Sequence, residues 1–158
     1  MDITLRWNQL IHDPLFRDMP YKIELNKSGQ ILLSPASNWH GHAQGELAKQ
    51  FGKKKKSGKI IAECSILTRL GVRVADIAWA SDSFIAKNGF TTPYMVSPEL
   101  CVEIVSPGNS QAELSKKVAL YLEKWAHEVW IVAQNGKMKI FGNVGEQKKS
   151  TIIPGVTL

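Results

Sequence analysis

The stretch GVRVADIAWA, residues 71–80, has the apolar character of a buried β-strand, and the aspartate Asp76 interrupts it. A second apolar strand, ELCVEIVSP at residues 99–107, contains Glu103 in the same way. A buried carboxylate is costly unless it is paired, hydrogen-bonded or bound to a metal, and two of them on neighbouring strands repel each other. A divalent cation between them removes this conflict, and carboxylate oxygens suit Mg²⁺ or Mn²⁺. The two strands therefore predict a shared metal site.

The helix that follows the second strand is expected over residues 111–126. Its apolar residues recur at i, i+4, i+7, i+8 and i+11, which is helical spacing; they are Leu114, Val118, Tyr121, Leu122 and Trp125. Lys117 lies at the flank of this stripe, so its ammonium can reach back toward the sheet. There it would position a water or stabilise developing phosphate charge. The alternative is that Asp76 and Glu103 form structural ion pairs with Arg73 or Lys117.

The rest of the chain predicts strands and helices around this core. A strand–helix–strand unit near the end indicates that part of the sheet is parallel. We expect an α/β fold with a central mixed sheet, and helices covering both its faces or one face and an edge. In chain order the elements are a helix over 4–19 interrupted at Asp13-Pro14, a hairpin of strands 21–25 and 30–33, a helix over 39–51, strands 59–67 and 72–80, a loop-rich stretch over 81–97, a strand over 99–105, the helix over 111–126, a hairpin of strands 129–132 and 137–142, and a surface tail.

Composition favours one globular, nucleic-acid-binding domain. The chain has 158 residues and a formal charge of +6, and a basic excess favours polyanions. The run Lys53, Lys54, Lys55 and Lys56 is a candidate contact for a phosphate backbone, with a solvated loop as the alternative. No apolar run is long enough for a membrane helix, and the first residues lack an apolar signal core, so we expect a cytoplasmic protein. Cys64 and Cys101 lie in strands and are expected as buried thiols.

Two further polar residues are candidates for supporting roles. Glu24, in the predicted hairpin, is either an additional metal ligand or a carboxylate facing water. His40 shares a helix face with Leu47 and Phe51, so it faces inward. There it would hydrogen-bond a phosphate or a carboxylate of the site, or simply pack as a core histidine.

The segments 71–79, 98–107, 117–121 and 128–131 together resemble the Uma family of candidate restriction endonucleases, within the PD-(D/E)XK nuclease superfamily. The resemblance spans about residues 20–142 and implies a restriction endonuclease-like core. It makes Asp76 the motif aspartate and Glu103 the motif acid. The superfamily's lysine usually lies two residues after the acid, where this chain has Val105, so the resemblance assigns that role to Lys117.

These observations predict a single domain over residues 1–158 that acts as a Mg²⁺- or Mn²⁺-dependent endonuclease on DNA phosphodiester bonds. Asp76, Glu103 and the carbonyl of Ile104 would hold the ion, and Lys117 would position the attacking water. Cleavage of both strands would call for two sites and hence a homodimer. The alternative is a catalytically inactive nuclease-fold domain that binds nucleic acid or a protein, since lysine is absent at position 105.

Overall fold

A computed structural model describes residues 1–158, and its central feature is a six-stranded mixed sheet in the order β3-β4-β5-β6-β7-β8. Only β5 and β6 run parallel, and α4 connects them; every other neighbouring pair is antiparallel. This confirms the predicted mixed sheet with a parallel unit near its end. The strands are β3 (Lys59–Thr68), β4 (Gly71–Ala80), β5 (Leu100–Ile104), β6 (Glu128–Val132), β7 (Met138–Gly142) and β8 (Gly145–Gln147).

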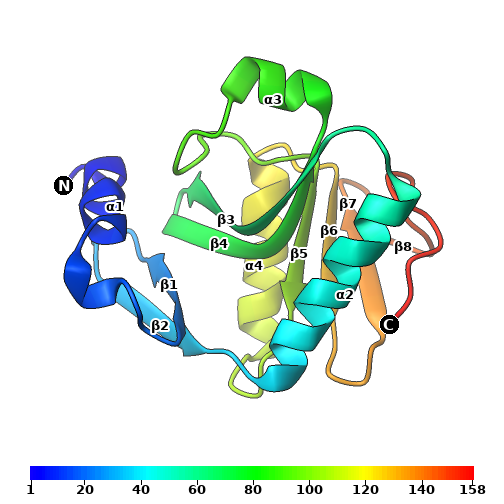
Figure 1. Ribbon diagram of the computed structural model, residues 1–158, viewed down its shortest axis with the longest axis horizontal. Coiled ribbons are helices and arrows are strands. Elements are labelled where there is room, and N and C mark those ends of the chain that lie inside the picture. The colour runs from blue at the N-terminus through cyan, green and yellow to red at the C-terminus, as the bar shows by residue number, and fades with distance from the viewer.

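Two helices cover opposite faces of this sheet, α2 (Asn38–Lys54) in front and α4 (Gln111–Glu123) behind, in the view of Figure 1. The start of α2 is capped by the Ser37 hydroxyl, and α4 begins with a reciprocal capping box between Ser110 and Glu113. Their buried residues meet different sides of the strands. On the α2 side these are Ala43, Leu47 and Phe51 with Ile77, Trp79, Val102 and Trp130; on the α4 side they are Val118 and Tyr121 with Ala78, Cys101 and Val129.

The N-terminal residues form a separate small layer beside β3 and β4, on the left of Figure 1. It contains α1 (Ile3–Ile11), the short 3-10 helix η1 (Pro14–Phe16) and the antiparallel pair β1 (Tyr21–Leu25) and β2 (Ile31–Pro35). The predicted break at Asp13-Pro14 is confirmed, because Asp13 caps η1 with proline at its first position. Trp7, Leu10 and Leu25 pack on Val72 and Val74 of β4, which fixes β1 against the sheet.

Three local expectations were wrong. The loop-rich stretch contains α3 (Asp82–Asn88), whose first turn is capped by the Ser81 hydroxyl. The helix after β5 ends at Glu123, three residues earlier than expected. Trp125 follows in a left-handed conformation, with φ of 71°, and is 68% exposed. It therefore leaves the apolar stripe, because the chain reverses direction there.

The C-terminal residues are part of the core, which corrects the expected surface tail. The Glu128 carboxylate accepts hydrogen bonds from the Ser150 hydroxyl at 2.6 Å and the Thr151 amide at 2.7 Å. Beyond these anchors, Ile153 and Val156 are buried in the cluster on the α2 side of the sheet. One buried acid thus attaches the last segment to β6.

The predicted cysteine state is confirmed, since Cys64 and Cys101 are free and buried. No helix of the chain has both the length and the apolar character that crossing a bilayer requires.

Candidate active site

The candidate site lies where β4 separates from β5. β4 pairs with β3 from Gly71 to Ala80, except at Asp76, but with β5 only from Ile77 to Trp79. Asp76 is the first residue beyond that pairing, and its Oδ2 accepts a hydrogen bond of 2.6 Å from the Ile104 amide. Because β4 no longer pairs with β5 at this point, the Asp76 carboxylate accepts the hydrogen bond that a backbone carbonyl of β4 would otherwise accept. Asp76 is fully buried as a result.

Lys22 of β1 places its ammonium between the two predicted acids. Its Nζ lies 2.7 Å from Asp76 Oδ1 and 3.2 Å from Glu103 Oε2, and only 10% of its side chain is exposed. Burial alone would lower the pKa of Lys22, but Glu103 and Asp76 outweigh it and the pKa is raised. Sequence reasoning missed this residue. The available signal was strand alternation, which puts Lys22 on the same face as the candidate Glu24.

Glu103 is held by two residues of α4. Its Oε1 accepts a hydrogen bond of 2.7 Å from the Tyr121 hydroxyl, and the Lys117 ammonium lies 3.1 Å from its Oε2. Tyr121 is fully buried, and burial raises the pKa of its hydroxyl well above the usual value. The structure therefore brings Lys117 to Glu103, as expected from its flank position. Arg73, the other partner considered, instead donates to the Leu25 carbonyl at 2.6 Å.

Glu24 completes the chain of charges from the β1 side. Its Oε1 lies 3.0 Å from the Lys117 ammonium and accepts a hydrogen bond of 2.8 Å from the Val74 amide. Burial would raise the pKa of Glu24, but Lys117 and Lys22 outweigh it and lower that pKa. Glu24 is therefore a buried carboxylate that holds Lys117, and it does not face water.

His40 reaches the cluster from the first turn of α2. Its Nε2 lies 3.2 Å from Asp76 Oδ1, and its Nδ1 lies 3.3 Å from the Ser106 hydroxyl. The hydrogen bond with Asp76 raises the pKa of His40. For Asp76 itself, burial is outweighed by Lys22 and His40, which hold its pKa well below the usual range. The inward-facing His40 thus meets a carboxylate, while His42 is exposed as expected.

Glu63 of β3 is a second residue that sequence reasoning missed. Its φ of 52° is uncommon for a non-glycine residue and falls where β3 lacks a paired position opposite Asp76. The Gln44 amide donates both to Glu63 Oε1 and to the Asp76 carbonyl, each at 2.7 Å. Burial raises the pKa of the Glu63 carboxyl. A local backbone kink of this kind leaves no signature in the sequence pattern.

The run from Lys53 to Lys56 lies away from this cluster, at the other end of α2. From His40 to Lys53 the helix rises roughly 20 Å at about 1.5 Å per residue. Lys55 lies over the Trp79 ring at 4.8 Å, and Lys56 donates to the Gly52 carbonyl at 3.2 Å. The structure therefore does not join the basic run to the acids, and its role as a phosphate contact stays a prediction.

One observation indicates that Asp76 and Glu103 can bind a divalent cation together. The Lys22 ammonium already occupies the position between them that such a cation would take. It touches Asp76 and Glu103 together, so both carboxylates can reach the same ion. The amide and carbonyl of a strand residue point to the same side of the strand. Since the Ile104 amide meets Asp76, its carbonyl faces the same gap. No group of three or more His, Cys, Asp or Glu side chains is placed to hold a metal, but Mg²⁺ commonly uses one or two carboxylates with waters and substrate phosphate.

Comparisons with known proteins agree with this fold. The chain matches the model of the Uma2 family, described as "Putative restriction endonuclease", over residues 9–153. It is also similar to a crystal structure from Anabaena variabilis ATCC 29413, titled "a putative nuclease belonging to DUF820", with a TM-score of 0.66 and 18% identity over 80% of this chain and 76% of that one. At that identity the likeness concerns the fold alone. No curated protein sequence is similar enough to match the chain.

Proposed function

Because this chain belongs to the Uma2 family, described as "Putative restriction endonuclease", we propose that it is a divalent-metal-dependent endonuclease that hydrolyses DNA phosphodiester bonds. The observation that supports this most is the convergence of Asp76 and Glu103 on one cation position, with Lys117 beside them. A merely structural ion pair would need one acid and one base. Here two buried acids share a single site.

In this proposal Asp76, Glu103 and the Ile104 carbonyl hold Mg²⁺ or Mn²⁺. When bound, the cation lowers the pKa of a coordinated water and neutralises charge on the scissile phosphate. The Lys117 ammonium, held between Glu24 and Glu103, positions the attacking water and stabilises negative charge on the phosphate. Lys117 thus takes the role that the superfamily gives to a lysine two residues after the acid.

The remaining polar residues orient this machinery. Tyr121 fixes the Glu103 carboxylate by donating to Oε1, so that Oε2 faces the cation position and Lys117. His40 and the Ile104 amide fix Asp76 from two directions. Such preorganisation matters because a misplacement of about 1 Å costs roughly 10²-fold in rate.

The direct test is cleavage of supercoiled plasmid DNA with Mg²⁺, Mn²⁺ or a chelator. Asp76→Asn, Glu103→Gln and Lys117→Met keep the side-chain size and should each reduce nicking by roughly 10²-fold or more. Glu46→Gln, at a partly exposed position of α2 outside the acid cluster, is the matched control and should cut like wild type. Nicking that persists in folded Asp76→Asn protein, or that is indifferent to the chelator, refutes the proposal. Sedimentation analysis under the same conditions tests the homodimer that double-strand cleavage would need.

A second candidate, a non-catalytic nucleic-acid-binding domain, is favoured by one observation. The Lys22 and Lys117 ammonium groups already pair with both acids, so each acid has a cationic partner without a metal. Calorimetric titration separates the two candidates. Heat of Mn²⁺ binding that Asp76→Asn removes supports the nuclease, and no heat at millimolar Mn²⁺ supports the non-catalytic domain.

A further inference from the structure

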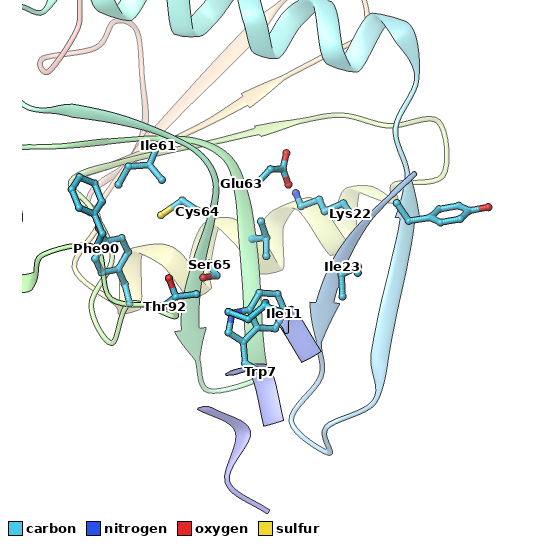
Figure 2. Close-up of a pocket in the computed structure, with 13 residues that line it drawn as sticks. Trp7, Ile11, Lys22, Ile23, Ile61, Glu63, Cys64, Ser65, Phe90 and Thr92 are labelled. Atoms are coloured by element: carbon cyan, nitrogen blue, oxygen red, sulfur yellow. The ribbon is translucent and has the colours of Figure 1, made fainter. Parts of the chain in front are cut away.

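A cavity of about 360 Å³ opens beside the acid cluster, between the N-terminal layer and β3 (Figure 2). Its volume falls in the range of small-molecule sites. The cavity has an apolar, partly aromatic wall and a polar end. Its walls include Trp7, Tyr21, Phe90 and Tyr94, and its polar end is formed by Lys22 and Glu63.

The rim of the cavity exposes aromatic surface. Phe90 is 67% exposed and Tyr21 is 42% exposed, although both are large apolar side chains. Both line the same cavity, so their apolar surface is available to a ligand there. Aromatic faces accept nucleic-acid bases by stacking, without needing a particular base.

The polar end connects the cavity to the proposed nuclease site. Lys22 lines this cavity and also lines the cleft that contains Glu103, Ile104 and Lys117. Figure 2 shows the ends of Lys22 and Glu63 pointing toward one another at that junction. The Glu63 carboxyl offers a partner for the amino or imino groups of a base, while Lys22 offers a cation for a phosphate.

We propose that this cavity holds one unpaired nucleobase of the DNA substrate. The base stacks against the aromatic wall, and its phosphate lies at Lys22 next to the acids. This inference rests on the proposed function for the identity of the substrate. It implies that the protein prefers single-stranded DNA, or a base already displaced from a duplex, because a stacked and paired base is not available to the cavity.

The test measures binding in a chelator, so that no cleavage intervenes. Single-stranded oligonucleotides containing 2-aminopurine are titrated with wild-type protein and Phe90→Ala. Trp125→Ala serves as the control, because Trp125 is 68% exposed, as Phe90 is, but does not line the cavity. We expect fluorescence quenching with wild type, roughly tenfold weaker binding with Phe90→Ala, and unchanged binding in the control.

Three outcomes would overturn the inference: equal affinity for intact and abasic oligonucleotides, equal affinity of Phe90→Ala and wild type, or no binding at all. Phe90 is largely exposed, so its removal leaves the fold intact and the comparison valid. Plasmid nicking in Mn²⁺ then separates this inference from the proposed function. A protein that nicks without a base-dependent affinity lacks the base site, and one that binds bases but never nicks lacks the nuclease activity.

Discussion

Replacing Lys22 with methionine removes the charge between Asp76 and Glu103 while keeping an unbranched side chain. The lost ammonium makes contacts of 2.7 and 3.2 Å in a site where its side chain is 10% exposed. Removing one partner of a buried ion pair costs about 3–5 kcal/mol. Both acids keep other donors, Asp76 from Ile104 and Glu103 from Tyr121, so we expect the lower end, about 3 kcal/mol of unfolding free energy. For a chain of this size that corresponds to a melting temperature lower by roughly 6–12 °C.

The same variant should bind divalent cations more tightly, because the metal no longer has to displace an ammonium. We expect Mn²⁺ affinity to rise by roughly tenfold or more in calorimetry, and Mn²⁺ to restore part of the lost melting temperature. Lys27→Met, in the exposed turn of the same hairpin, is the control and should change neither quantity. An unchanged melting temperature, or Mn²⁺ affinity equal to or weaker than wild type, would refute the assignment of Lys22 to the cation position.

Three further variants test other parts of the structure. Glu128→Gln should cost about 2 kcal/mol in urea unfolding at pH 7, since hydrogen bonds to a charged group contribute about 1.5–3 kcal/mol. Burial would raise the pKa of Glu128, but the bonds from Ser150, Thr151 and Trp130 outweigh it and lower that pKa. The stabilisation by the Glu128 carboxylate is therefore fully present above pH 4.5, its ordinary pKa, and is lost as the pH falls through its lowered pKa in the folded protein. The unfolding free energy of Glu128→Gln should therefore change less with pH below 4.5 than that of wild type, and an unchanged dependence on pH contradicts this. Tyr121→Phe should keep the fold but reduce plasmid nicking by roughly tenfold through a less fixed Glu103, and undiminished nicking argues against that role. Gly71→Ala should lower the melting temperature, because φ is 103° there and a Cβ would overlap the Leu25 carbonyl; a wild-type melting curve would exclude that strain.

Most of the elements were predictable because their signals are local. Apolar periodicity placed α2 and α4, turn residues placed the β1–β2 hairpin, and the two interrupted strands identified Asp76 and Glu103. Local signals did not predict that the C-terminal residues belong to the core, because a single acid of β6, Glu128, holds them there. Nothing near Ser150 in the sequence indicates that its hydroxyl donates a hydrogen bond to Glu128.

The candidate site divides in the same way. The sequence by itself determined which acids are anomalous, since a carboxylate in an apolar strand needs a compensating charge wherever it folds. Only the tertiary structure decided what compensates them, because Lys22 reaches Asp76 and Glu103 from a strand of the other sheet. It also placed Glu63, at a backbone kink, against Gln44 of α2. Such contacts depend on how separate layers pack, and packing joins residues whose distance along the chain gives no hint of their distance in space.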